Sequence, residues 1–163
     1  MRVAIHAALL AVLWQGVAAP GPPADPAGVG QVKIAPPAVH VMRPGAADTL
    51  RLVFQVAPGL HVQAHPAADA FLIPLTLELE AAAGLELGPV VYPPPQIHRL
   101  ADTGAELLVC AGTVSIAIPV MLTAMLPDGS ATVRGTLRWQ ACDAKRCFAP
   151  RSTPVELRIT AAH

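Results

Sequence analysis

The chain has 163 residues, 53% of them hydrophobic and 13% charged, and its 11 Lys and Arg residues balance its 11 Asp and Glu residues. This neutral balance argues against binding to nucleic acid or to an anionic membrane surface, because both need a basic patch. The length fits one domain, which buries enough surface to fold without the help of disulfides.

The N-terminus shows the three-part pattern of a secretory signal. Positively charged Arg2 precedes the apolar stretch Val3–Trp14, and small residues follow at 16–19. The apolar stretch is shorter than the roughly 20 residues that span a bilayer, although an uncleaved anchor is the alternative. We therefore predict that residues 1–19 are a signal peptide for export, with cleavage after Ala18 as a second possibility.

Proline and glycine dominate the next segment, residues 20–30, which has no apolar period and is expected to be a flexible linker. The remaining residues, 31–163, are expected to form a single domain. No later segment is long and apolar enough to span a membrane, so we expect no membrane span in the mature chain.

Apolar and polar residues alternate over most of this domain, which predicts β-strands with one face on a core. The alternation covers residues 50–56, 73–79, 116–122, 133–139 and 155–159. An apolar run at 107–111 predicts another strand, and residues 32–41 can add one more. Only Ala81–Ala83 hints at a helix, and this run is too short to count.

Turn signals separate the strands, notably Pro58-Gly59 and the segment 127–129. Pro74 and Pro119 fall inside strand patterns, so these strands should be edges or bulged there. Many short strands without a helical period favour a β-sandwich over a barrel.

The most informative residues are Cys142 and Cys147, which lie where one strand ends, at Gln140, and before another begins, near Thr153. Four residues separate the two thiols. A tight loop of this length can bring two Cα atoms within the roughly 4.4–6.8 Å that a disulfide allows.

The spacing of this pair leaves three interpretations open. A structural staple over such a short loop would contribute about 2 kcal/mol. A redox pair is favoured by Lys145 and Arg146, because cations stabilise the attacking thiolate. Asp143 opposes them beside Cys142, so Cys147 has the nearer positive neighbours.

A metal site is the third interpretation, and the spacing supports it weakly. Structural zinc takes four protein ligands, and the two cysteines supply only half of them. His61 and His65 could add two more, but Pro66 indicates an extended loop, and both histidines are interpreted as surface or loop residues. We therefore expect neither a metal nor a cofactor. The third cysteine, Cys110, lies in an apolar strand and is interpreted as a buried, inert thiol.

Three stretches give the chain a family resemblance over residues 32–160. They are Gly59–Pro66 followed by Phe71–Thr76, then Val109–Val120, and finally Leu137–Cys142 closed by Cys147–Pro150. In this order they resemble the N-terminal periplasmic domain of the thiol:disulfide interchange protein DsbD. The third stretch is the most specific of the three.

The resemblance implies an all-β, immunoglobulin-like antiparallel β-sandwich in the periplasm, with the cysteine pair at one end. It implies that a membrane thiol relay donates electrons and that periplasmic thioredoxin-fold proteins receive them, as in cytochrome c biogenesis. In this family pattern Cys147 forms the mixed disulfide with the partner and Cys142 resolves it. No cofactor is required.

Three features depart from the family pattern. Full-length members continue into a transmembrane relay and a thioredoxin-like domain, whereas this sequence ends at His163, so we expect either a separate electron donor or a different way of working. The segment matching the family's aromatic cap, residues 96–100, contains no aromatic side chain to shield the pair. Ile97 and Leu100 are the candidates to cover it, and the cap role is assigned to neither. Cys110 occupies a strand position that is commonly tyrosine.

Two hypotheses follow. The first is a periplasmic thiol–disulfide exchange module that passes electrons to oxidised partner proteins through Cys142 and Cys147. The second is a secreted β-sandwich binding module in which the same disulfide is only structural. A metal-binding protein that uses His61, His65 and the cysteines is a third and weaker possibility.

Overall fold

The computed structural model describes residues 30–100 and 102–162, so the predicted signal peptide of residues 1–19 and nearly all of the 20–30 linker lie outside the described residues. The described part is all-β, as predicted. Its strands are β1 Val32–Ile34, β2 Val39–Met42, β3 Ala47–Val56, β4 His61–Gln63, β5 Thr76–Leu79, β6 Leu85–Leu87, β7 Gln96–Arg99, β8 Glu106–Cys110, β9 Thr113–Leu122, β10 Ser130–Trp139, β11 Ala141–Cys142 and β12 Arg151–Ala161.

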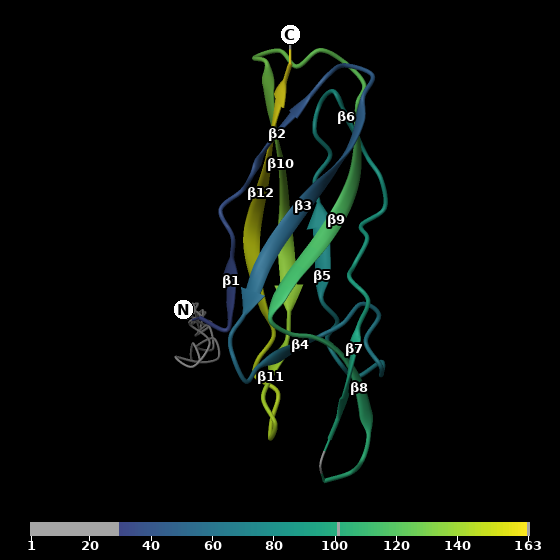
Figure 1. Ribbon diagram of the computed structural model, residues 1–163, viewed down its shortest axis with the longest axis vertical. Helices are drawn as coiled ribbons and strands as arrows, with labels where there is room; N and C mark the ends of the chain where they lie inside the picture. Colours follow the sequence, from purple (N-terminus) through teal and green to yellow (C-terminus); the bar gives the residue numbers. More distant parts are fainter. Residues whose placement is uncertain (1–29, 101, 163) are drawn as a thin grey trace, which may run out of the picture.

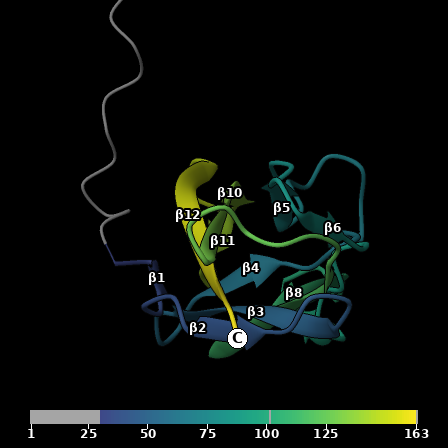
Figure 2. The ribbon, with the colours of Figure 1, turned by 90° about the horizontal axis from the view of Figure 1, so that it is seen from above.

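Two four-stranded sheets face each other and form the predicted immunoglobulin-like sandwich (Figure 1). One sheet has the order β1-β3-β9-β6 and the other β2-β12-β10-β5. Seen from above, β3 lies in one layer, and β10, β12 and β5 lie in the other (Figure 2). Alternate residues of the four long strands fill the space between the layers, for example Leu50, Phe54, Ile116, Ile118, Val133, Leu137, Leu157 and Ile159.

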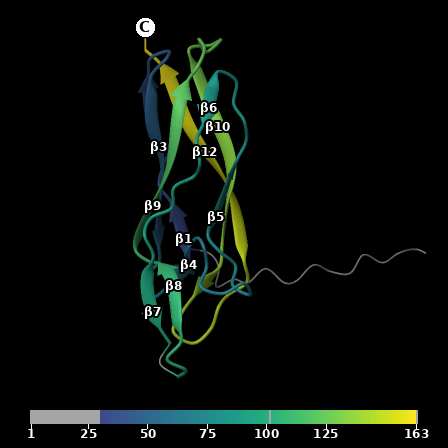
Figure 3. The ribbon, with the colours of Figure 1, turned by 90° about the vertical axis from the view of Figure 1, so that its right-hand side faces the viewer.

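A third sheet, of order β11-β4-β8-β7, closes one end of the sandwich (Figure 3). Its strands continue those of the two layers, because β4 follows β3, β8 leads into β9, and β11 follows β10. The third sheet therefore joins the two layers at this end. The C-terminal end of β12 lies at the opposite end of the long axis (Figure 1).

The segment 32–41, predicted as one strand, is two strands in different sheets. β1 pairs antiparallel with β3, whereas β2 pairs parallel with β12. Pro36 and Pro37 lie between them and lack the N–H groups that would continue a ladder. This crossing adds one parallel pair to a sandwich that we expected to be antiparallel throughout.

The prolines inside strand patterns behave differently from each other. β5 is an edge strand, as expected, and it begins two residues after Pro74. Pro119 lies in β9, which has neighbours on both sides, so its strand is not an edge. On the β6 side, Leu87 pairs with Val120 and Val91 with Ala117, which leaves one extra residue opposite the proline. The bulge expected near Pro119 therefore lies in the facing segment between Leu87 and Val91, not in β9 itself.

Gly135 sets how closely β5 approaches β10. A Cβ atom at this position would lie 2.3 Å from the backbone oxygen of Glu78 and 2.8 Å from Cδ2 of Leu79. We expect Gly135→Ala to lower the free energy of unfolding by about 1–3 kcal/mol, because the edge strand must move outward. Thr136→Ala, at the exposed neighbouring position, should change it by less than about 0.5 kcal/mol. Equal stability of the two variants in urea unfolding would contradict this close-packing argument.

Candidate functional site

Cys142 and Cys147 face each other across a short hairpin at the end of the third sheet. The two residues form an antiparallel bridge and a disulfide with an S–S distance of 2.02 Å. Phe148 N donates to Ala141 O on one side of the pair, and Asp143 N donates to Arg146 O on the other, at 2.8 and 2.9 Å. The structure therefore brings together the two residues that the spacing selected.

The Cα atoms of the pair are 3.9 Å apart, closer than the range expected from sequence. The flanking hydrogen bonds explain the difference, because they make the cysteines a non-hydrogen-bonded pair of an antiparallel ladder. In such pairs the two backbones approach more closely than in hydrogen-bonded pairs. The hairpin itself thus holds the two sulfur atoms within bonding reach.

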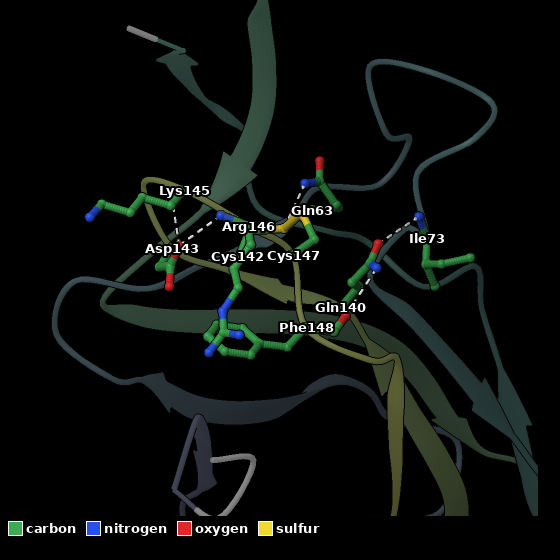
Figure 4. The surroundings of a disulfide bond; sticks show 9 residues. All are labelled: Gln63, Ile73, Gln140, Cys142, Asp143, Lys145, Arg146, Cys147 and Phe148. Carbon is green, nitrogen blue, oxygen red and sulfur yellow. Dashed lines mark hydrogen bonds between the residues drawn. A yellow bond between two sulfur atoms is a disulfide. The ribbon is translucent and has the colours of Figure 1, made fainter. Parts of the chain in front are cut away.

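The carboxylate of Asp143 organises the turn of this hairpin (Figure 4). Its Oδ1 accepts the backbone N–H groups of Lys145 and Arg146 at 2.7 and 2.8 Å. These two hydrogen bonds lower the pKa of Asp143, and the neighbouring cations act in the same direction. The acidic residue beside Cys142 is therefore bound to the loop backbone, and the side chains of Lys145 and Arg146 remain exposed.

The two sulfur atoms differ in their access to solvent. Cys142 is 1% exposed, whereas Cys147 is exposed. The two cysteines therefore differ in solvent exposure as well as in the charge of their sequence neighbours. Next to Cys147, the guanidinium carbon of Arg146 lies 4.9 Å from the ring centroid of Phe148, and this ring packs against the core.

Gln140 ties the hairpin to the loop between β4 and β5. Its Nε2 donates to Phe148 O at 3.1 Å, and its Oε1 accepts the N–H of Ile73 at 3.4 Å (Figure 4). One side chain thus fixes the chain after the disulfide and a loop far away in sequence. The link joins backbone groups and does not contact either sulfur atom.

A cleft of about 300 Å³ lies beside the disulfide, lined by both cysteines and the hairpin. Its other walls come from His61, Leu72, Leu100, Asp102, Thr103 and Leu107. Of the two aliphatic residues considered as covers for the pair, Leu100 lines this cleft, whereas Ile97 is 68% exposed. Leu100 thus lines the cleft from the segment that matches the family's aromatic cap, next to the polar residues Asp102 and Thr103.

The prediction that His61 is a surface or loop residue was wrong. It is 6% exposed, lies on β4 and pairs with Cys142 in the ladder. Its ring packs against the ring of His98 with centroids 4.5 Å apart and the two planes tilted by 34°, and its Nε2 has no hydrogen-bond partner among the described residues. Burial, and then the charge of His98, lower the pKa of His61, while Asp143 acts against them.

His65 is exposed and contacts a different ring from the one that His61 contacts. Its ring stacks on Tyr92 with centroids 4.1 Å apart, and its Nδ1 lies 3.0 Å from Leu75 O.

Within residues 30–100 and 102–162, no three His, Cys, Asp or Glu side chains form a group that could hold a metal ion. The same residues include no helix with the length and hydropathy needed to cross a bilayer.

Cys110 is a buried free thiol, as predicted. It is 4% exposed and packs in the main core, and burial raises its pKa.

Sequence reasoning missed two residues near the disulfide, Gln63 on β4 and His98 on β7. The polar side chains at positions 61 and 63, two residues apart, were the available signal, since they fall on one face of a strand.

Comparison with known proteins places this arrangement in a family. A family model described as the N-terminal region of thiol:disulfide interchange protein DsbD matches residues 31–158. Comparison with curated proteins gives no significant match. Among solved structures, the chain is similar to the reduced DsbD N-terminal domain of Neisseria meningitidis, at 16% identity and a TM-score of 0.46. That match covers 70% of this chain and 79% of the other.

A second similar structure is the N-terminal periplasmic domain of ScsB from Proteus mirabilis, at 12% identity and a TM-score of 0.50. The match covers 77% of this chain but only 44% of the ScsB chain. At this identity the likeness shows the sandwich fold.

The lowered pKa of His61 predicts a pH-dependent loss of stability. As the pH falls through the ordinary value of 6.5, the unfolded chain takes up a proton that the folded chain resists. The free energy of unfolding is therefore unaffected by His61 above this pH and falls below it. His61→Phe, which keeps a ring against His98, should lose less stability than the unmodified protein between about pH 7 and pH 5. Guanidinium unfolding at both pH values measures this, and equal losses would contradict it.

Proposed function

Because this chain belongs to the family of the N-terminal domain of thiol:disulfide interchange protein DsbD, we propose that it is a thiol–disulfide exchange module that passes electrons through Cys142 and Cys147. The observation that carries this proposal is the difference in access between the two sulfur atoms. Cys147 is open to a partner, whereas Cys142 is buried directly behind it. This arrangement suits one attacking and one resolving thiol.

In the first step, the thiolate of reduced Cys147 attacks a disulfide of the partner. The partner's S–S bond breaks, one of its sulfur atoms leaves as a thiolate and takes up a proton, and a mixed disulfide forms. The exposed Lys145 and Arg146 beside Cys147 favour its thiolate.

In the second step, the thiolate of Cys142 attacks the Cys147 sulfur of the mixed disulfide. The bond to the partner breaks, the second partner sulfur leaves and is protonated, and the Cys142–Cys147 disulfide forms. Two electrons and two protons have then passed to the partner. A dithiol donor must reduce the pair again, and we propose a membrane thiol relay for this role.

The site and the family also support proposals on location and partners. The ScsB domain similar to this chain is periplasmic, and residues 1–19 have the pattern of a secretory signal, so we place the exchange reaction in the periplasm. The cleft beside the pair, with leucine side chains and both acidic and basic groups in its walls, would contact the partner. The partners proposed are oxidised thioredoxin-fold proteins.

Trapping tests the order of the two steps. Cys142→Ser removes the resolving thiol, so a mixed disulfide through Cys147 should accumulate with thioredoxin-fold partners. Cys147→Ser leaves only a buried thiol and should trap little. Both variants carry Cys110→Ala, and complexes are quantified on non-reducing gels. Trapping by Cys147→Ser that equals or exceeds that by Cys142→Ser would reverse the assigned roles.

Reduction should leave the domain folded. The loop closure contributes about 2 kcal/mol, whereas domains of this kind are stable by about 5–15 kcal/mol. We therefore expect a small drop in melting temperature on reduction, measured in Cys110→Ala to exclude scrambling. We also expect a reduction potential above about −300 mV, the region of exchange pairs. A domain that unfolds at room temperature when reduced would instead favour a binding module with a structural disulfide.

A further inference from the structure

Gln63 places a buried amide against the disulfide. The residue is 0% exposed, and its Nε2 donates to Sγ of Cys142 at 3.4 Å (Figure 4). Its Oε1 is buried and has no hydrogen-bond partner in the part of the chain that the structure describes. A buried amide whose oxygen has no hydrogen-bond partner lowers the free energy of unfolding. An apolar side chain would fill the same space without this cost.

The register of the third sheet places the amide of Gln63 next to Sγ of Cys142. Cys142 is the ladder partner of His61, and Gln63 follows two residues later on β4. Residues two apart on a strand share a face, so the side chains at positions 61, 63 and 142 lie on the same side of the sheet. The intervening Val62 pairs with Cys110 and faces the main core.

Burial disfavours a thiolate at Cys142 once the disulfide is reduced. The same cause raises the pKa of Cys110, which is 4% exposed, and Cys142 is only 1% exposed. A neighbouring N–H donor opposes this penalty, because a hydrogen bond to the charged form favours that form. The amide of Gln63 is such a donor, held at the sulfur by the sheet.

We propose that Gln63 is a catalytic residue that stabilises the thiolate of Cys142 while this thiolate attacks the mixed disulfide. The proposal rests on the resolving role given to Cys142 above. In this step the Cys142 proton leaves to solvent through the cleft, a bond forms from Cys142 Sγ to Cys147 Sγ, and the bond from Cys147 to the partner breaks. The electron pair of that bond leaves on the partner sulfur, which is then protonated.

Other charged and titratable groups surround the same cleft and could also influence Cys142. They are His61 on β4, His98 on β7, Asp102 in the following loop, and Asp143, Lys145 and Arg146 in the hairpin. A test must therefore leave all of them in place and change the amide alone.

The first experiment compares Gln63→Met with Gln140→Met. Methionine keeps the length of glutamine and removes its N–H donors. Gln140 is a matched control because its amide contacts backbone groups of Ile73 and Phe148 in the same region. In a Cys147→Ser, Cys110→Ala background, the ultraviolet absorbance of the thiolate reports the pKa of Cys142. Gln63→Met should raise this pKa by about one pH unit, and Gln140→Met should leave it unchanged.

The second experiment measures resolution without a natural partner. Reduced protein carrying Cys110→Ala reacts with Ellman's reagent, and Cys147 releases the first thionitrobenzoate. Attack by Cys142 then releases the second, and this slower phase should be about tenfold slower in Gln63→Met. Gln63→Asn, which keeps the amide but shortens its reach, should change the rate in the same direction and serves if Gln63→Met does not fold.

These readouts separate the inference from the proposed function. An unchanged Cys142 pKa and an unchanged second phase in a folded Gln63 variant would overturn the role of the amide. An equal effect of Gln140→Met would also overturn it, since the change would then reflect loop packing. A failure of Cys142→Ser to trap thioredoxin-fold proteins would instead contradict the proposed function and leave the effect of Gln63 on the thiol intact.

Discussion

The register between β4 and β11 is the constraint on which the site depends. It pairs Ala141 with Val62 and Cys142 with His61, and this pairing decides which side chains face the main core and which face the disulfide. A slip of one residue would turn Gln63 toward the core and Val62 toward the sulfur. The sandwich supports this register, because β4 and β11 are short continuations of long strands that are fixed by their own ladders.

The long strands were predictable, whereas the short strands were not. β3, β9 and β10 each have ten residues and β12 has eleven, so the alternation of apolar and polar side chains repeats often enough to be recognised. β4 has three residues, all buried, and β11 has two, so neither shows an alternation. The cysteine pair was found because both thiols lie in one hairpin. The contact from Gln63 to Cys142 spans 79 positions, and only the tertiary fold brings these residues together.

The proposed exchange reaction requires the two thiols to be activated within an all-β domain. Many reactive cysteines lie at the N-terminus of a helix, where the macrodipole favours the thiolate. The described residues of this protein contain no helix, so the available stabilisation comes from individual groups. Cys147 has the exposed cations of the hairpin, and Cys142 has the amide of Gln63. Because the two proposed contributions are separate, we expect substitution to alter the reactivity of one sulfur without altering that of the other.

The disulfide hairpin and the C-terminal end of β12 lie at opposite ends of the elongated sandwich (Figure 1). A label, an affinity tag or a solid support attached after β12 would therefore be separated from the disulfide hairpin by the length of the two-layer core. Immobilised in this way, the domain would present its cysteine loop outward, with the cleft open to a protein in solution. The geometry makes the C-terminal end a suitable attachment point for surface-based tests of the proposed exchange reaction.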